Sequence, residues 1–233
     1  MGSTGEKHLS RLAAPKHWPI KRHGLKWITR LRPGAHSIKT GMPLNLILRD
    51  LLGYADSNKE VKAILNHQDV LVDGKRRKEL RFNTGVMDVL SLPKISEYYR
   101  ILFDKKGRIV LLPIKESESR TKVCKIIGKR LIKGKLQINL SDGKNLLVEK
   151  GDYKKGDSVL IEVPVLKVKE VLAMAKGNLV YMTAGKHVGE IGHVMELKGE
   201  RIVVKTNVSE FETLRRYGLV IGKDKPVISL IKE

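Results

Sequence analysis

The sequence has few of the residues that stabilise small secreted proteins or membrane proteins. Its 233 residues include a single cysteine, Cys124. An internal disulfide and a zinc site made of several thiolates are therefore excluded, and one free thiol is typical of a reducing cytosol. No apolar run approaches the roughly 20 residues that a membrane-spanning helix needs. The N-terminus carries charge without an apolar stretch, so we expect no secretory signal.

Acidic residues are scarce relative to basic ones. The chain has 25 Asp and Glu against 46 Lys and Arg, a formal net charge of +21. Repulsion on this scale destabilises a compact chain unless a polyanion is its usual partner. Nucleic acid is the first candidate, and an anionic membrane surface is the second. Aromatic residues are 5% of the sequence and hydrophobic residues 41%, which favours several small cores of Val, Ile and Leu.

Residues 1–41 are basic and are interrupted by proline and glycine. Such a segment cannot bury enough apolar surface to fold by itself, so we expect an extended arm. Both tryptophans and four histidines lie among its cations, which favours stacking on bases and pairing with phosphates once RNA is present. A solvated tail is the alternative, and a zinc site made of the histidines lacks a completing ligand at familiar spacing. The candidate RNA-binding residues are Lys7, Arg11, Lys16, His17, Trp18, Lys21, Arg22, Lys26, Arg30, Arg32 and His36.

Between Met42 and Pro93 the pattern predicts two helices followed by strands. Apolar residues recur at helical spacing over 44–52, and Gly53 ends that helix. Ser57 and Glu60 have the spacing of a capping box at the start of the second helix. A strand over 70–72, an Asp-Gly turn and a further strand over 86–92 follow.

The polar side of the second helix and the basic run after the Asp-Gly turn can share one outer face. Lysine and arginine on such a face suit a phosphate backbone. The candidate RNA-binding residues of this unit are Arg49, Asn58, Lys59, Lys62, Lys75, Arg76, Arg77, Lys78 and Arg81.

From Glu97 to about Leu172 short apolar runs alternate with turn residues. The runs over 98–103 and 108–112 predict a hairpin, and four further strands suggest a small barrel or curled sheet. The lysines and arginine on the first half of this region fit either a solvated strand face or RNA contacts; they are Lys122, Lys125, Lys129, Arg130, Lys133 and Lys135.

Residues 177–197 place a glycine-rich loop between two strands. The spacing of Gly185, Gly189 and Gly192 does not match a nucleotide-binding fingerprint. Glycine allows a positive φ or a close approach of the backbone to a partner. The order strand, loop, strand resembles the KOW motif of ribosomal proteins and transcription elongation factors, and the resemblance implies RNA contacts at Lys186 and His187.

We find no arrangement of residues in the sequence that predicts catalysis. There is no P-loop, no nucleophile elbow and no paired zinc-binding histidines. Cys124 lies in an alternating strand, which favours a buried structural thiol. We interpret Asp73 as a turn residue, and nothing in the sequence brings Asp69 or Asp88 together with other groups. We therefore expect no enzyme activity, no cofactor and no metal.

Two further stretches of the sequence resemble known families. The elements over 42–96, with Val70-Leu71-Val72-Asp73-Gly74-Lys75 among them, resemble the S4-type RNA-binding module. The run Arg11-Leu12-Ala13-Ala14-Pro15-Lys16-His17-Trp18 resembles the N-terminal signature of the S4e family of archaeal and eukaryotic small-subunit ribosomal proteins. This second resemblance extends over nearly the whole chain. It implies small-subunit ribosomal RNA and neighbouring ribosomal proteins as partners.

The sequence thus predicts a multi-domain α+β protein. Its expected parts are an extended basic N-terminal arm (1–41), a two-helix S4-type RNA-binding domain (42–96), a central β-rich barrel-like domain (97–172) and an SH3-like KOW β-barrel with the C-terminal segment (173–233). We expect a structural constituent of the cytoplasmic small ribosomal subunit that neutralises phosphates and recognises RNA shape. The alternative is a KOW-containing transcription elongation or antitermination factor. We expect neither a membrane partner nor a small-molecule substrate.

Overall fold

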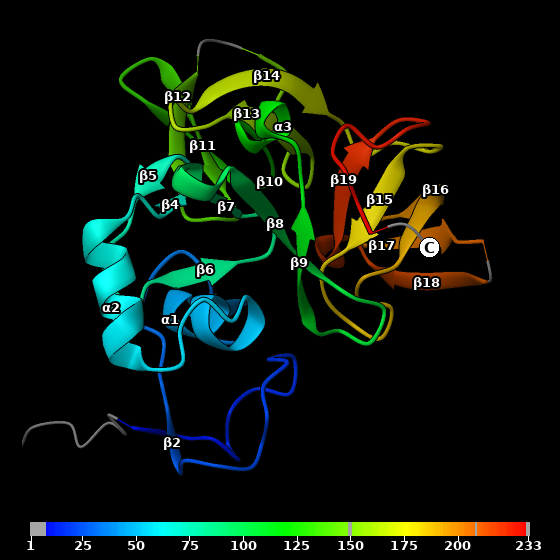
Figure 1. Ribbon diagram of the computed structural model, residues 1–233. Coiled ribbons are helices and arrows are strands. Elements are labelled where there is room, and N and C mark those ends of the chain that lie inside the picture. The colour runs from blue at the N-terminus through cyan, green and yellow to red at the C-terminus, as the bar shows by residue number, and fades with distance from the viewer. Residues whose placement is uncertain (1–7, 149–150, 208, 232–233) are drawn as a thin grey trace, which may run out of the picture.

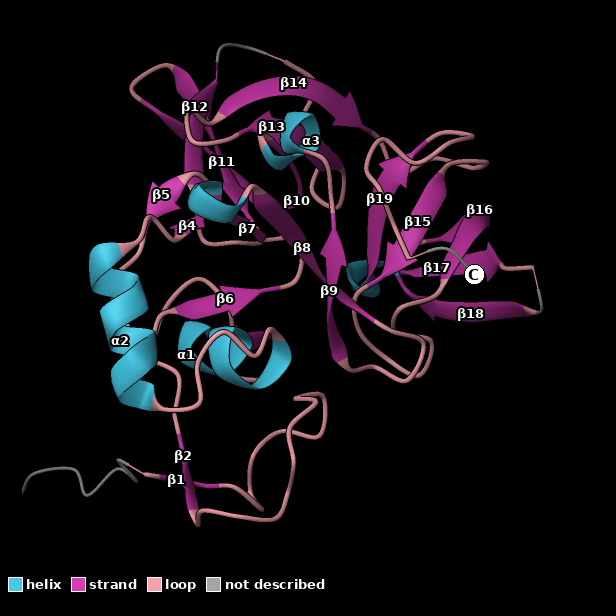
Figure 2. Cartoon of the chain, in the orientation of Figure 1, coloured by secondary structure: helices cyan, strands magenta, loops and turns pink. Residues whose placement is uncertain are grey.

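The fold is mostly β, with few and short helices (Figure 2). A computed structural model describes residues 8–148, 151–207 and 209–231 of the chain. The expected α+β class is therefore correct only in part. The helical elements are α1 (Leu44–Leu46), the π-helical turn η1 (Ile47–Leu51), α2 (Asn58–His67), the 3₁₀ turn η2 (Pro93–Ile95), α3 (Glu116–Ser119) and the 3₁₀ turn η3 (Arg215–Tyr217).

In the residues that the structure describes, the strands form three five-stranded antiparallel sheets and two short ladders. The short ladders pair β1 (Leu9–Ser10) with β2 (Trp27–Ile28) and β3 (Gly41–Pro43) with β6 (Asn83–Gly85). The first sheet has the order β5-β4-β7-β8-β9, made of β5 (Lys75–Arg76), β4 (Leu71–Val72), β7 (Val89–Leu92), β8 (Glu97–Phe103) and β9 (Ile109–Pro113).

The other two sheets form the second half of the chain (Figure 1). The central sheet has the order β12-β11-β10-β13-β14, made of β12 (Asn145–Val148), β11 (Lys135–Leu140), β10 (Thr121–Ile132), β13 (Ser158–Glu162) and β14 (Lys167–Leu172). The C-terminal sheet has the order β18-β17-β16-β15-β19, made of β18 (Glu210–Leu214), β17 (Arg201–Lys205), β16 (Ile191–Lys198), β15 (Leu179–Met182) and β19 (Gly218–Gly222).

The two predicted helices form where the sequence places them. The first ends in a π turn, in which Leu52 N–H donates to Ile47 O at 2.9 Å, and Gly53 leaves the helix with φ +69°. The hydroxyl of Ser57 accepts from the Glu60 N–H, while the Glu60 carboxylate accepts from the Asp56 N–H at 2.9 Å. This reciprocal pattern satisfies amides at the start of α2, as a capping box requires.

The predicted turn is present, but the strand expected over 86–92 is broken. Asp73 and Gly74 both have positive φ, 50° and 71°, as the tight turn between β4 and β5 requires. The chain then turns at Met87, with φ 72°, between β6 and β7. Gly85 lies against the ring of His36, and the Asp88 carboxylate accepts from the Gly85 N–H at 2.9 Å. These contacts fix a bend where apolar pattern alone predicts a continuous strand.

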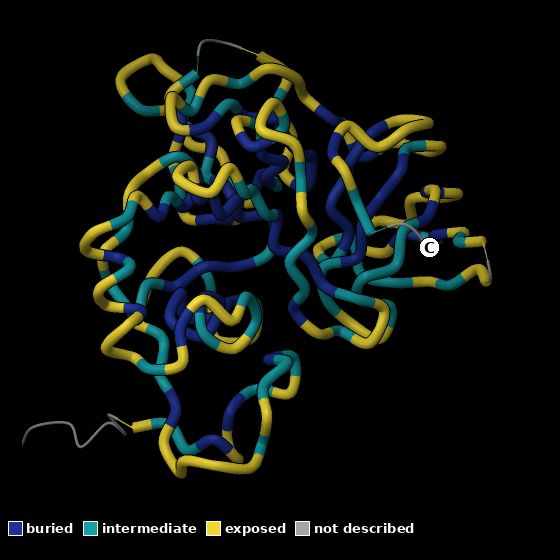
Figure 3. The backbone as a smooth tube through the Cα atoms, viewed as in Figure 1, coloured by how far each residue is buried: buried dark blue, intermediate teal, exposed yellow. Residues whose placement is uncertain are grey.

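The β8–β9 hairpin is present as predicted, but it belongs to the first sheet. Because β8 pairs with β7, that sheet crosses the expected division between residues 96 and 97. One apolar core joins residues from the arm, the α1–α2 region, the first sheet and the C-terminal sheet. A second, smaller core lies within the central sheet around Cys124 and Ile138. Figure 3 shows buried backbone where the sheets meet, and short buried stretches separated by exposed ones within the arm.

Candidate nucleic-acid interface

The arm folds onto the protein instead of remaining extended. Trp18 is 1% exposed, and its Nε1–H donates to Gly41 O at 2.8 Å. The carbonyl of His17 accepts from the Ile109 N–H at 2.9 Å, which ties the arm to β9. The prediction that Trp18 stacks on an RNA base is therefore wrong for this fold. The β3 and β9 regions provide the apolar surface that the arm lacks in isolation.

His17 also has a structural environment. Its ring packs edge-on against Trp18 and Phe103, with centroids 6.3 and 6.1 Å away. Burial lowers its pKa below the ordinary value for histidine. A neutral ring provides no charge for a phosphate, so His17 is better suited to positioning the arm than to an ion pair.

Two arginines of the arm bind backbone carbonyls of the arm itself. Arg11 donates to Lys21 O at 2.8 Å and to Leu25 O at 3.0 Å. Arg22 donates to Ala14 O and Pro15 O, both at 2.8 Å. These contacts close the loop of the arm. Because the acceptors are uncharged, both guanidinium groups keep their net charge and add to the positive potential of the segment.

The exposed aromatic side chain of the arm is Trp27, which lies in the β1–β2 ladder. It is 53% exposed. His8 packs against its ring at 5.3 Å, and Lys26 Nζ lies 5.0 Å above it. An aromatic face with cations beside it is suited to a nucleotide base. In the sequence both tryptophans lie among cations, and this pattern does not predict which of them is buried and which is exposed.

The end of the arm runs along the basic segment after β5. Arg81 Nε donates to Arg30 O at 3.1 Å, and Arg32 forms an exposed ion pair with Glu79 at 3.1 Å. His36 lies 3.0 Å from the Asp88 carboxylate with 8% of its side chain exposed. His36 is therefore part of the interior, whereas Arg30 and Arg32 remain near the surface.

The α1–α2 region and the β4–β5 hairpin lie side by side (Figure 1). Arg76 joins them, because it donates to Asn66 O at the end of α2 and pairs with Asp69. Arg49 and Asn58 are bonded to each other at 2.8 Å, and Arg77 packs over the ring of Phe82. The exposed cations that remain on this part of the surface are Lys59, Lys62, Lys75, Arg76 and Lys78.

The glycine-rich loop over 183–190 packs on the β8–β9 hairpin. A Cβ on Gly189, whose φ is +84°, would clash with the backbone of Asp104. Gly189 thus allows the loop backbone to lie close to the β8–β9 hairpin of the same chain, not to a partner. His187 stacks on Phe211 at 3.6 Å and bonds to Glu190 at 3.1 Å, while Lys186 is exposed. Lys186 is therefore the residue of this pair that is available to a partner.

A buried ionic cluster lies where the arm, the first sheet and the central sheet meet. Lys122 Nζ lies 2.7 Å from Asp73, 2.5 Å from Asp88 and 3.0 Å from Asp142, and Lys144 also pairs with Asp73 and Asp142. The interpretations of Asp73 as only a turn residue and of Asp88 as unconnected are therefore wrong. Sequence spacing carries no signal for this cluster, because its members come from separate elements.

Protonation in the cluster follows from burial and charge. Burial opposes the charged form of Lys122, but Asp88 and Asp73 raise its pKa well above the ordinary value. Burial likewise favours a neutral Asp142, yet Lys122 and Lys144 lower its pKa to about 2. Burial raises the pKa of the Cys124 thiol, whose Sγ lies 3.5 Å from Asp142. Cys124 is thus the buried structural thiol that the sequence predicts.

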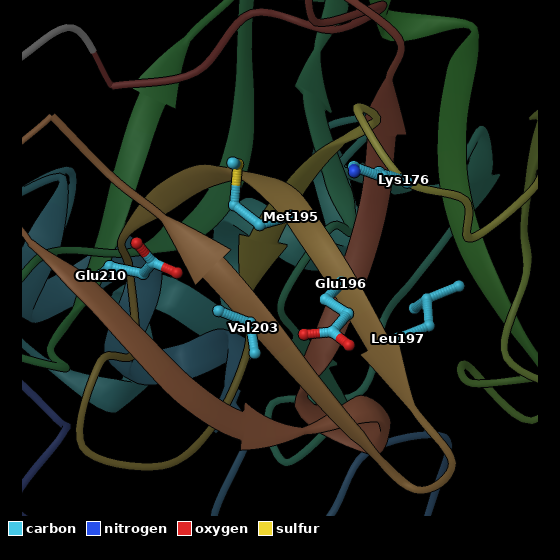
Figure 4. Close-up of a pocket in the computed structure, with 6 residues that line it drawn as sticks. All are labelled: Lys176, Met195, Glu196, Leu197, Val203 and Glu210. Carbon is cyan, nitrogen blue, oxygen red and sulfur yellow. The ribbon is translucent and has the colours of Figure 1, made fainter.

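A shallow hollow of about 400 Å3 lies on the outer face of β16 and β17 (Figure 4). Val203 lies between the carboxylates of Glu196 and Glu210, with Met195 and Leu197 beside them. The lining has one cation, Lys176, against two carboxylates, and an excess of acidic groups does not suit a polyanion. This face is accordingly outside the candidate RNA surface.

The candidate RNA-binding residues that the structure describes thus fall into two groups. The first is exposed or near the surface and consists of Lys16, Lys21, Lys26, Arg30, Arg32, Lys59, Lys62, Lys75, Arg76, Lys78, Arg81 and Lys186. The second holds the fold together and consists of Arg11, His17, Trp18, Arg22, His36, Arg49, Asn58, Arg77 and His187. Lys7 lies outside the described residues. In the described ranges, no helix is long and apolar enough to cross a membrane, and no three His, Cys, Asp or Glu are arranged to hold a metal.

Comparison with known proteins adds an independent observation. Residues 95–168 match the family described as Ribosomal family S4e, and residues 3–39 match the RS4NT domain. The chain is 44% identical to the small ribosomal subunit protein eS4 of Methanosphaera stadtmanae, over 99% of this chain and 98% of that protein. The chain belongs to the S4e family.

Other members of the S4e family agree with this assignment. Identity to the eS4 protein of Methanocella arvoryzae is 43%, over 97% of this chain and 98% of that protein. The crystal structure of the 30S ribosomal protein S4e from Thermoplasma acidophilum is similar, with a TM-score of 0.68 and 30% identity. That likeness covers 79% of this chain and 96% of the other. The family resemblance stated from the sequence is confirmed.

Proposed function

We propose that this protein is a structural constituent of the small ribosomal subunit and that it binds small-subunit ribosomal RNA. Its place is then on the cytoplasmic ribosome, beside neighbouring ribosomal proteins. Binding proceeds by neutralising phosphates and recognising RNA shape, without a small-molecule substrate or a cofactor. The protein stabilises folded RNA because it binds that form preferentially.

The observation that carries the proposal is the surplus of exposed cations in a chain of the S4e family. The formal net charge is +21. The five exposed cations lie in α2, in β5 or directly after β5, and Arg76 is the one of them with a carboxylate partner among the described residues. Charges of one sign without internal partners favour an external polyanion.

The finer architecture belongs to the same proposal. We assign residues 42–96 to an S4-type RNA-binding domain, whose sheet continues through β8 and β9 of the next region, and residues 173–233 to a KOW-containing β-barrel region. Residues 1–41 and 97–172 are then the arm and the central domain. The capped helix α2, the Asp73-Gly74 turn and the positive φ of Gly185 and Gly189 support this assignment. Lys186 then provides an RNA contact apart from the α2 surface.

A salt titration tests the proposal. The full chain is titrated with a small-subunit ribosomal RNA transcript at several salt concentrations, with an unrelated structured RNA of equal length as the control. We expect tighter binding to the ribosomal transcript, and a log–log salt slope of roughly −0.7 to −0.9 for each phosphate contact. A flat salt response, or equal affinity for both RNAs, contradicts the proposal.

The alternative of a transcription elongation or antitermination factor is not retained. The similar proteins cited above, which match nearly the full length of the chain, are small-subunit ribosomal proteins. Sedimentation of the native protein distinguishes the two functions directly. A ribosomal protein sediments with the small subunit, and an elongation factor co-purifies with RNA polymerase. Since the Cys124 thiol is buried and its pKa is raised, it offers no nucleophile, and we propose a binding protein rather than an enzyme.

A further inference from the structure

A cleft of about 760 Å3 lies between the central sheet and the C-terminal sheet. On one side are β10 and the chain before β13, with Lys125 and Lys155. On the other side is η3, with Arg215 and Arg216. Of these four residues, only Lys125 is among the lysines for which the sequence leaves RNA contact open. The lining of the cleft shares no residue with the α2 surface or with the Lys186 loop.

The cleft has a strong excess of positive charge. Four cations line it against one carboxylate, that of Glu200. Among the described residues, none of the four cations forms an ion pair with Asp or Glu, whereas cations elsewhere, such as Arg108 and Arg201, do. Like charges brought together in a concave site repel one another, and a bound anion removes that repulsion.

Lys125 holds the floor of the cleft in place. Its Nζ donates to Arg215 O at 2.7 Å and to Gly218 O at 2.5 Å, although about 90 residues separate it from them. Burial, together with the charge of Arg215, lowers the pKa of Lys125 to about 8. Lys125 therefore links the two sheets and positions η3.

Arg215 is held flat against the opposite wall. Gly156, with φ +99°, lies beneath its guanidinium group, and a Cβ there would lie 3.1 Å from Nε and 3.4 Å from Nη2. The Nε–H is buried and has no hydrogen-bond partner in the protein. A planar guanidinium with unused donors at the edge of a cleft is suited to the oxygens of a phosphate.

We propose that this cleft is a further RNA site, in which Lys155, Arg215 and Arg216 contact phosphodiester groups of a single strand that passes between the two sheets. The inference rests on the proposed function of the protein. RNA fits better than a small anion because the volume far exceeds one phosphate group, and because the apolar side chain of Ile127, 53% exposed, lies beside the cations. Such a wall suits a ribose or a base. Bound RNA then fixes the relative position of the two sheets.

The test compares two double variants of the full chain. The variant K155Q/R216Q removes two cleft cations that lie outside the buried core, and K223Q/K225Q removes two exposed lysines near the C-terminus. The probe is the small-subunit ribosomal RNA transcript, titrated at several salt concentrations. We expect the cleft variant to bind at least 10-fold more weakly, with a salt slope shallower by about 1.4–1.8, as two lost phosphate contacts require. The control variant should change neither quantity appreciably.

Equal affinity and equal salt slope in the cleft and control variants overturn the cleft proposal while leaving wild-type RNA binding intact. Absence of RNA binding by the wild type instead contradicts the proposed function itself.

A titration with inorganic phosphate completes the test. If phosphate saturates the cleft at micromolar concentration and RNA does not compete, the cleft is a site for a small anion and the RNA proposal is wrong. Thermal unfolding of both variants checks that they fold. R215K keeps the charge but lacks the planar fork of donors, so it should recover only part of the affinity that R215Q loses.

Discussion

The ammonium group of Lys122 lies 2.7 Å from the carboxylate of Asp73, although 49 residues separate them in sequence. Asp88 and Asp142 complete the contacts of the same ammonium group. Asp73 and Asp88 come from the first sheet and its turns, and Lys122 and Asp142 come from the central sheet. The cluster therefore links two parts of the molecule that otherwise have separate local structure.

Replacing Lys122 tests this link. In Lys122→Met, three buried carboxylates lose their shared partner, so we expect the free energy of unfolding to fall by about 3–5 kcal/mol. Urea denaturation measures the change. Lys129→Met, an exposed lysine on the same strand, is the matched control and should stay within about 0.5 kcal/mol of the wild type. Equal effects of the two substitutions would show that the cluster does not stabilise the fold.

Acid sensitivity follows from the lowered pKa of Asp142. Because its pKa in the folded protein is about 2 and its unfolded value is about 3.9, the unfolded state binds more protons between these values. The stabilisation that the ionised Asp142 carboxylate provides is therefore complete above pH 4, and it is lost as the pH falls toward 2. Its magnitude is on the order of 2–3 kcal/mol.

Denaturation curves between pH 5 and pH 2 measure this loss. In Asp142→Asn the dependence on pH over that window should be weaker than in the wild type, while Asp152→Asn, at an exposed position, should leave it unchanged. An identical pH profile for wild type and Asp142→Asn would contradict the assignment.

The two tryptophans should separate stability from RNA binding. Trp18→Ala removes a fully buried ring, so we expect a loss of about 3–5 kcal/mol in the free energy of unfolding. Trp27→Ala removes an exposed ring. It should leave stability nearly unchanged and weaken RNA binding by about 1–3 kcal/mol through lost stacking. Each variant is the control for the other, and the reverse pattern would refute the assignment of roles.

Charge reversal tests the surface formed by α2 and the β4–β5 hairpin. The variant K62E/K75E/K78E changes exposed side chains that have no carboxylate partner among the described residues, so it should keep the wild-type unfolding temperature. We expect RNA affinity to fall by more than 10-fold and the salt slope to become shallower by roughly 2–3, one contact for each residue. Arg77 is left intact because it packs on Phe82.

A matched variant carries the same change of charge elsewhere. Lys167, Lys169 and Lys176 are exposed in and after β14, so K167E/K169E/K176E alters net charge equally. If both triple variants lose the same affinity, binding depends on total charge, and the α2 surface has no special role.

Local features of this protein follow from its sequence because neighbouring residues determine them. The helix ending at Gly53, the capping box of Ser57 and Glu60 and the Asp73-Gly74 turn all involve residues within a few positions of one another. The strong excess of basic residues likewise favours a polyanionic partner without any knowledge of the fold. Family membership was visible in one run of eight residues.

Tertiary structure alone decided which of the basic and aromatic residues remain at the surface. Trp18 is buried because β3 and β9 lie beside it, whereas Trp27 has no such neighbours among the described residues and is exposed. The residues around each tryptophan in the sequence do not predict this difference. The sequence pattern places Lys122 and Lys125 on a strand that faces either solvent or RNA. In the structure both ammonium groups instead bind partners that are distant in sequence, Asp73 for Lys122 and Arg215 O for Lys125. A buried charge without a partner costs much free energy, so a lysine is buried only where an acceptor or a carboxylate is buried with it. These partners come from distant elements, and only the tertiary structure brings them together.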